Sequence, residues 1–438
     1  MTNILHRVVA SIGFAFLLTA NSPAQCVPTW APGASVPGTD GDVFAAAMWD
    51  PDGPGPLPVH PVVGGRFRVA GDVVANGLAA YRADTGVWSA FGSGFTANGA
   101  APELHAILPL PGGELIAAGS FTHAGGVLAR NVARWDGVAW SPLGAGTDGR
   151  VKALARLPDG SVVAGGTFLQ AGGVVANRLA RWDGSNWLPV GAPAAIGGTA
   201  VEALTVVGAD LFVAGEFASA GGVPCAHVAR WDGAAWWPCG PGTNATVFAL
   251  ATTAAGEVVA GGSFTVAGGV PAAGVARWDG TSWAPLGTGV SGAFGQVFDV
   301  AAFAGGEIVI AGNFLTAGGA PARCIARWDG AGWGPLGNGT SDRVFAIAGD
   351  DAGDLIAGGM FASAGGGVCK CVARWVAGAW FATATGTGGA VNAVAVGPGG
   401  IVFAGGEFTQ LEGDPVSFIA RHDGSHWVSL GFGVDGPV

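Results

Sequence analysis

One aromatic position recurs along almost the whole chain and divides it into units of nearly constant length. The position is occupied in turn by Tyr81, Trp135, Trp182, Trp231, Trp278, Trp328, Trp375 and His422. Neighbouring members of this series are 47 to 54 residues apart. The phenylalanine of a Gly-Gly-x-Phe pattern keeps the same spacing, from Phe67 to Phe408. A fixed period of roughly 40 to 50 residues is typical of propellers and solenoids, so eight copies of one unit predict a repeat fold.

Each unit is predicted to contain four short strands, because its apolar residues follow a period of two and no helical period occurs in the repeats. In the third unit we expect strands at residues 151–154, 161–168 and 177–182, and a last one around Trp187. Asp183-Gly184 between the last two is a strong hairpin signal, since glycine accepts positive φ. The prediction is an all-β protein, a β-propeller of four-stranded antiparallel blades with eight repeats. Seven blades stay possible if one end unit is irregular.

The repeated pattern resembles the kelch repeat, in which a double glycine closes the second strand and a tryptophan follows in the fourth. It is more similar to the kelch-like propellers of fungal cortical polarity markers and of secreted bacterial proteins, which share Gly-Gly-x-Phe and Ala-Arg-Trp-Asp-Gly-x-x-Trp. The resemblance covers about residues 43–433 and recurs in every unit. It implies the fold and not an activity, because propellers host unrelated functions.

The segments around the repeats predict an exported protein. Residues 1–24 have the pattern of a signal peptide, with a basic start, an apolar run at residues 8–20 and a small-residue cleavage site. That run is too short for a membrane span, which needs roughly 20 apolar residues. Residues 25–42 are expected to form a lead-in and, through Trp30, a closing outer strand. Residues 43–438 would then be the propeller, located outside the cell or in the cell envelope.

Composition narrows the possible partners. The formal net charge of −11 argues against nucleic acid, whose binding needs a basic surface. Although many strands are apolar, no apolar stretch of the sequence is long enough to span a bilayer, so no membrane span is predicted. Cys225 and Cys239 lie on the two arms of one hairpin, so an exported chain permits a disulfide between them. Cys369 and Cys371 lack a second cluster, so no metal is predicted. Several Gly-x-Gly-x-x-Gly stretches are followed by strands rather than by the helix of a dinucleotide site, so no cofactor is predicted.

Two charged positions repeat in nearly every unit, which favours structural roles for them. An arginine recurs in the third strand, where it can pair with a carboxylate or stack on tryptophan; its members are Arg134, Arg181, Arg230, Arg277, Arg327, Arg374 and Arg421. An aspartate recurs in the hairpin turn; its members are Asp136, Asp183, Asp232, Asp279, Asp329 and Asp423.

A function is expected where the units differ. In propellers of this kind the first strand lines the central channel, and the residue after its leading apolar position varies; the members of this series are Phe44, His105, Lys152, Glu202, Phe248, Phe298, Phe345 and Asn392. The third residue of Gly-Gly-x-Phe varies too, and its charged members are Arg66, Glu216 and Glu407. Aromatic and charged groups around a concavity are typical of a ligand site. The alternative is that these are tolerant positions along a water-filled channel.

These observations lead to one main hypothesis and two alternatives. The main one is a secreted, non-catalytic binding or scaffold module for an extracellular glycan or protein. The first alternative is a hydrolase or lyase that acts on polysaccharide at the channel mouth, with His105, Lys152 and Glu202 as acid–base groups on adjacent blades. The second is a structural protein of the cell envelope. No residue is assigned a catalytic role under the main hypothesis.

Overall fold

The computed structural model describes most of the repeat region. Its described residues are 42–53, 55, 57, 59–70, 73–82, 87–98, 101–191, 196–292, 294–303, 305–349, 355–368, 371–376, 378–382, 389–396, 402–408, 410–411, 414–415, 418–422 and 427–429. All of them belong to one compact unit, Ser35–Val438. The predicted signal peptide, Trp30 and the lead-in to residue 41 lie outside the described residues.

Thirty-two strands form eight antiparallel blades of four, each blade in the order first, second, third, fourth. The first strands are β1 (Asp42–Trp49), β8 (Glu103–Pro109), β14 (Val151–Arg156), β20 (Ile196–Val207), β25 (Val247–Thr252), β32 (Gln296–Ala302), β38 (Val344–Gly349) and β44 (Val391–Val396). The second strands are β2 (His60–Arg66), β9 (Leu115–Ser120), β15 (Val162–Gly166), β21 (Asp210–Ala220), β26 (Val258–Gly262), β33 (Ile308–Asn313), β39 (Leu355–Gly359) and β45 (Val402–Gly406).

The outer half of each blade comes from the Ala-Arg-Trp-Asp-Gly part of the repeat. The third strands are β5 (Leu78–Arg82), β12 (Val132–Trp135), β18 (Leu179–Trp182), β23 (Val228–Trp231), β29 (Val275–Trp278), β36 (Ile325–Trp328), β42 (Val372–Val376) and β48 (Ile419–His422). The fourth strands are β6 (Val87–Ala90), β13 (Trp140–Pro142), β19 (Trp187–Pro189), β24 (Trp236–Pro238), β30 (Trp283–Pro285), β37 (Trp333–Pro335), β43 (Ala379–Ala382) and β49 (Trp427–Ser429).

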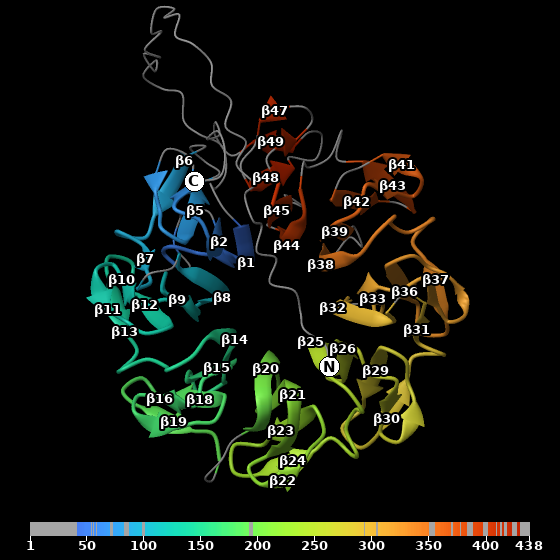
Figure 1. Ribbon diagram of the computed structural model, residues 1–438, viewed down its shortest axis with the longest axis horizontal. Helices are drawn as coiled ribbons and strands as arrows, with labels where there is room; N and C mark the ends of the chain where they lie inside the picture. The colour runs from blue at the N-terminus through green and yellow to red at the C-terminus, as the bar shows by residue number, and fades with distance from the viewer. Residues whose placement is uncertain are drawn as a thin grey trace, which may run out of the picture. The chain divides into compact units, whose positions relative to one another are not determined.

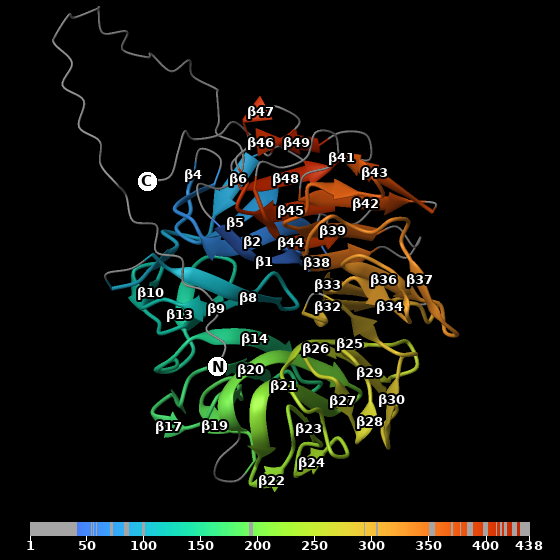
Figure 2. The same cartoon turned by 45° about the vertical axis from the view of Figure 1, so that its right-hand side comes forward.

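The eight blades surround a common axis, with the first strands innermost (Figures 1 and 2). Each first strand contacts the first strand of the next blade, and β44 of blade eight contacts β1 of blade one. The ring is therefore closed by eight blades, which confirms the predicted fold class and settles the open choice between seven and eight. Every blade takes its four strands from one continuous stretch of sequence. The described part of the chain has no helix that could cross a membrane.

An Ala-Gly-Gly stretch follows the second strand in six of the eight units and forms a turn of its own. In blade three it forms the turn between β16 (Gln170–Ala171) and β17 (Val174–Val175), with Gly172 and Gly173 at φ of +60° and +84°. Two positive φ values in a row match the hairpin turns that suit the twist of β-strands. The other short strands are β3 (Val69–Ala70), β4 (Val73–Val74), β7 (Phe95–Thr96), β10 (His123–Ala124), β11 (Val127–Leu128), β22 (Val223–Pro224), β27 (Val266–Ala267), β28 (Val270–Pro271), β31 (Val290–Ser291), β34 (Thr316–Ala317), β35 (Ala320–Pro321), β40 (Ser363–Ala364), β41 (Gly367–Val368), β46 (Gln410–Leu411) and β47 (Asp414–Pro415).

Tryptophans join neighbouring blades. In blades two to seven the indole N–H of the fourth-strand tryptophan donates to a carbonyl oxygen of the preceding blade's closing loop, over 2.5 to 3.0 Å; the donors are Trp140, Trp187, Trp236, Trp283, Trp333 and Trp380. Each of these rings also lies 5.4 to 5.6 Å from the third-strand tryptophan of its own blade. A buried indole N–H usually finds such an acceptor, so these fourth-strand tryptophans contribute contacts between neighbouring blades.

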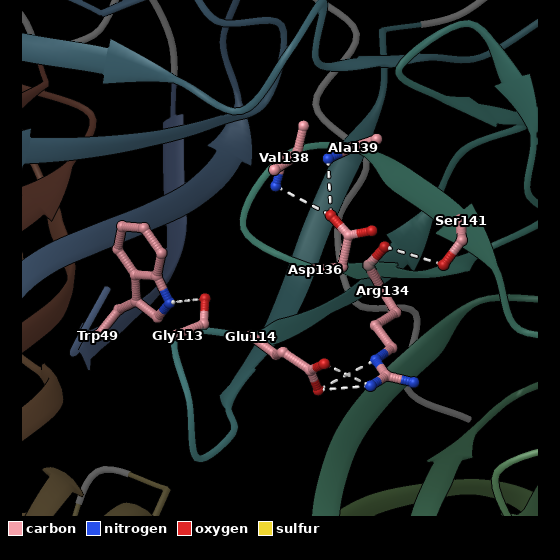
Figure 3. A network of polar contacts seen from close by, with 8 residues as sticks. All are labelled: Trp49, Gly113, Glu114, Arg134, Asp136, Val138, Ala139 and Ser141. Carbon is pink, nitrogen blue, oxygen red and sulfur yellow. Dashed lines mark hydrogen bonds and ion pairs between the residues drawn. The ribbon is translucent and has the colours of Figure 1, made fainter. Parts of the chain in front are cut away.

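The repeated arginines and aspartates take the structural roles expected for them. Figure 3 shows Arg134 facing Glu114 of its own blade, at 2.5 Å, and Asp136 accepting from the backbone N–H groups of Val138 and Ala139. The same arginine–acid pair occurs at Arg181–Asp159, Arg230–Asp210, Arg277–Glu257 and Arg327–Glu307. The same turn bonds hold at Asp183, Asp232, Asp279 and Asp329. The side chains of Arg374 and Asp423 lie outside the described residues.

The possible disulfide between Cys225 and Cys239 is not formed. Both residues are buried free thiols. They pack on opposite faces of blade four: Cys225 belongs to the apolar cluster shared with blade three, and Cys239 to the cluster shared with blade five. The position of the two cysteines on one hairpin therefore did not predict a disulfide correctly, because their side chains pack into different interfaces of blade four.

Candidate binding site at the channel mouth

A β-bulge places the variable residue of every first strand. In blade three the pairing with β15 shifts between Val151 and Ala153, so Lys152 is an extra residue without a partner in the ladder. The same shift occurs at the equivalent place in all eight blades. A bulge bends the strand and redirects a side chain. The variable residues predicted from the sequence therefore all lie at the same backbone position, the bulge of their first strand.

The second glycine of Gly-Gly-x-Phe allows this bulge to form. A Cβ atom at Gly166 would lie 2.1 Å from the carbonyl oxygen of Arg150, and one at Gly312 would lie 2.0 Å from that of Gln296. Real Cβ atoms do not approach a backbone oxygen so closely, so only glycine fits where the bulged strand crosses its neighbour. The glycine pattern thus positions the channel residues.

The bulge residues and those that follow them surround a central cavity of about 470 Å³. Six of the eight predicted members line it: Phe44, His105, Phe248, Phe298, Phe345 and Asn392. The next residue of each strand also faces the cavity and is alanine in seven blades. Small alanine side chains leave space along the axis, and the volume is within the usual range of roughly 300–1,000 Å³ for small-ligand sites.

One side of the mouth is aromatic. Phe248, Phe298 and Phe345 come from three successive blades, and we call them the aromatic arc. Their ring centroids are 6.0 Å apart between the first two and 5.9 Å apart between the last two, with tilted planes. All three side chains are half-buried and line the cavity. The arc presents a continuous apolar surface that is open to the channel.

The other side is charged, and we call Arg66, Glu103, His105, Arg150, Lys152 and Glu202 the charged arc. Glu103 lies at its centre: its carboxylate is 2.8 Å from Arg150, 3.3 Å from His105 Nε2 and 3.7 Å from Arg66. Lys152 Nζ donates to both carboxylate oxygens of Glu202, at 2.7 and 2.8 Å. These two residues do not line the cavity, because each is engaged with the other.

His105 is held as a neutral ring. It stacks on Phe44 with ring centroids 5.1 Å apart and nearly parallel planes. Burial, followed by the nearby Arg150 guanidinium, lowers the pKa of His105 to about 4, although Glu103 acts in the opposite direction. The structure thus engages His105, Lys152 and Glu202 in contacts with protein groups. It does not present them as a free acid and base facing one substrate position.

The remaining predicted residues lie further from the cavity. Arg66 places its guanidinium 6.0 Å from the Phe44 ring centroid and is half-exposed. Glu216 is exposed and accepts a hydrogen bond of 2.7 Å from the Thr199 hydroxyl. Glu407 is exposed at the end of β45. None of these three lines the cavity, and ligand binding by them stays a prediction.

Sequence reasoning missed Asp299, the residue after Phe298. Asp299 lines the cavity at the position where the other seven blades have alanine. Its Oδ2 accepts from the backbone N–H of Ile347 in the next blade, and its Oδ1 accepts from that of Val300, both at 2.9 Å. Burial raises the pKa of Asp299 to about 6, against these two hydrogen bonds. The signal in the sequence was the single break in an otherwise constant alanine column.

A family model agrees with the fold. Residues 157–182 match a family described as a domain of unknown function, the DUF5122 β-propeller. Among curated proteins, none matches this sequence. Similar solved structures include YCF48 bound to D1 peptide, at 16% identity over 75% of this chain and 93% of that one (TM-score 0.44). Another is the WD40 β-propeller domain of Doa1, at 12% identity over 74% of this chain and 94% of that one (TM-score 0.43). A third is the extracellular domain of BT3049 from B. thetaiotaomicron, at 11% identity over 92% of this chain and 47% of that one (TM-score 0.40).

Within the described residues, no group of three or more His, Cys, Asp or Glu side chains is placed to hold a metal ion. What the arrangement offers chemically is a concave surface with phenyl rings on one side and paired charges on the other. Such a surface can bind an amphipathic ligand.

Proposed function

We propose that this chain is an exported, non-catalytic binding propeller whose channel mouth takes a peptide segment of a protein partner. We also infer that its repeat is of the kelch-like type. The binding proposal rests on one observation: the phenyl rings of the aromatic arc are open to the cavity, whereas the polar groups of the charged arc are engaged with one another. A ligand therefore gains most by covering the rings, since burial of apolar surface contributes roughly 25 cal/mol per Å².

A glycan is the less favoured ligand on the same grounds. Sugars need hydrogen-bond partners for their hydroxyl groups, and an unpaired buried polar group costs about 1–3 kcal/mol. Phenylalanine offers none, Lys152 and Glu202 would have to break their own bonds first, and the cavity wall adds few polar side chains beyond Asp299 and Asn392. The same engagement argues against the hydrolase or lyase, because a general acid or base must reach the substrate proton.

The test is a parallel screen of the full chain on a peptide library and a glycan array. The variant Phe248→Ala with Phe298→Ala removes most of the aromatic arc. Val138→Ala serves as control, because Val138 is highly exposed in a turn between the outer strands of blade two. Peptide binding that the double variant loses and the control retains supports the proposal. Glycan binding with no peptide hit, or peptide binding that survives the double variant, contradicts it.

A further inference from the structure

Asp299 is the one carboxylate that lines the central cavity in the described part of the chain. The other residues around the cavity are alanine, larger aliphatic side chains, the aromatic rings and Asn392. Strand β32 itself carries no second charge, and the strands packed against it, β25, β26, β33 and β38, contain no titratable or charged residue. Among the described residues of these strands, the carboxylate of Asp299 therefore meets no cation, and its pKa is raised by burial and lowered only by its two backbone hydrogen bonds.

The two hydrogen bonds of Asp299 do not use its full capacity. An ionised carboxylate offers about four acceptor sites on its two oxygens, and the backbone N–H groups of Val300 and Ile347 occupy two. The bond to Ile347 also links blade six to blade seven. Seven blades keep their places in the ring with alanine at this position, so the ring does not require such a link.

Asp299 follows directly on Phe298, in the centre of the aromatic arc. Phenyl rings attract cations through their negative faces, and the attraction is worth about 0.5–2 kcal/mol, more when water is excluded. A single carboxylate beside three rings suits a singly charged, weakly hydrated cation with an apolar body. It does not suit a hard metal ion, since Ca²⁺ takes about 6–8 oxygen ligands and the wall around Asp299 is mostly alanine and hydrocarbon.

We propose that the channel recognises an organic cation, an alkylammonium or guanidinium group, between the aromatic arc and the carboxylate of Asp299. The inference rests on the proposed function, since it names the chemistry of the ligand at the same mouth. Two sources have this chemistry: a lysine or arginine side chain of a protein partner, and a free small amine.

The first experiment measures binding of isopentylammonium to the full chain by calorimetry at pH 7.5. Isopentanol and isovalerate have hydrocarbon bodies of similar size; isopentanol is uncharged and isovalerate is negatively charged. We expect the ammonium compound to bind about tenfold more tightly than either, and Asp299→Ala and Asp299→Asn to lose about that factor. Binding of isopentanol should stay unchanged in both variants, which shows that the cavity is intact. Glu216→Gln is the matched control, because it removes an exposed carboxylate outside the cavity.

The pH dependence gives a second readout that a structural role would not produce. Burial raises the pKa of Asp299 to about 6, so roughly one carboxylate in ten is ionised at pH 5. The ammonium group stays charged over this range. Binding by the natural chain should therefore weaken about tenfold between pH 7.5 and pH 5, and the weaker binding by Asp299→Ala should not change.

Capped Ala-Lys-Ala and Ala-Arg-Ala, each compared with capped Ala-norleucine-Ala, separate the two sources. Tighter binding of the basic tripeptides than of isopentylammonium assigns the site to a partner's side chain, and the reverse order assigns it to a small amine. Equal binding of the three isopentyl compounds, or undiminished cation binding by Asp299→Ala, would overturn the inference. The proposed function would still stand in that case if the double phenylalanine variant loses its peptide ligand.

Discussion

The outer strands and the first strands of this propeller follow opposite rules. On the outside, blades two to six repeat the same arginine, tryptophan and turn aspartate, and each residue makes the same bond from one of these blades to the next. At the channel, one backbone geometry carries five different residue types over the eight blades, with phenylalanine in four of them. Uniform residues thus mark the contacts that build the ring, and variable residues mark the surface on which selection for binding can act.

The channel mouth itself also has two unlike sides. Blades two to four supply most of the charged arc, and blades five to seven supply the aromatic arc and Asp299. Charges on one side are paired with each other, while the lone carboxylate on the other side meets no cation among the strands packed against it. The repeat is therefore symmetric in its backbone and asymmetric in its chemistry, which would give a ligand at the proposed site one orientation.

The largest expected effect comes from removing an outer tryptophan. Trp283 is buried and donates to the carbonyl oxygen of Cys239 in the preceding blade at 2.6 Å. Trp283→Ala should lower the free energy of unfolding by about 3–5 kcal/mol, because it leaves a cavity and an unpaired carbonyl. Trp237→Ala is the control, since Trp237 is 47% exposed, and it should cost under about 1 kcal/mol. Urea unfolding measures both, and equal losses would show that the outer tryptophans are not the contacts that hold the blades together.

A smaller loss of stability is expected at the second-strand glycine that faces the bulge of the first strand. Gly166→Ala would place a methyl group 2.1 Å from the carbonyl oxygen of Arg150. The bulge at Lys152 must then shift, at a cost of about 1–3 kcal/mol. Gly332→Ala has no atom within 4 Å of its new Cβ and should change stability by no more than about 0.5 kcal/mol. The free energy of unfolding of both variants checks this, and a neutral Gly166→Ala would mean that the bulge does not depend on glycine.

A substitution at the mouth should leave stability unchanged at neutral pH and change its pH dependence. The pKa of His105 is about 4 in the folded chain and roughly 6.5 when unfolded. The unfolded chain therefore binds more protons between these values, so stability falls as the pH drops through this window. His105→Phe, the residue of blades five to seven, should match the natural chain at pH 7.5 and be more stable by about 2–3 kcal/mol at pH 4.5.

The control for this prediction is Asp299, which acts with the opposite sign. Its folded pKa of about 6 exceeds an unfolded value of roughly 3.9, so the folded chain binds more protons in that range and gains stability on acidification. Urea unfolding at several pH values should therefore be repeated with His105→Phe in the Asp299→Ala chain. Parallel stability curves with and without His105 would refute the assignment of the acid-sensitive contribution to this ring.

The sequence alone was sufficient for the fold because the repeat gives the same information eight times. Strand order, the hairpin at Asp183-Gly184 and the structural roles of Arg181 and Asp183 all follow from local patterns and are confirmed. The bulge could not be predicted, because the register of β14 against β15 is a property of two paired strands. The sequence also did not predict which side chains contact each other. Lys152 pairs with Glu202 of the next blade, and the thiols of Cys225 and Cys239 face different interfaces.

The smallest expected effect belongs to the repeated arginine–acid pairs. Arg134 and Glu114 form a pair with two hydrogen-bonded nitrogens (Figure 3), yet the arginine side chain is 41% exposed. Water screens such a pair, so a double-mutant cycle with Arg134→Ala and Glu114→Ala should give a coupling free energy of only about 0.2–1 kcal/mol. Raising the salt concentration should reduce it further. A coupling above about 2 kcal/mol would place these pairs beside the tryptophans among the main contacts of the ring, and the repeated outer residues would then have to be ranked by charge as well as by burial.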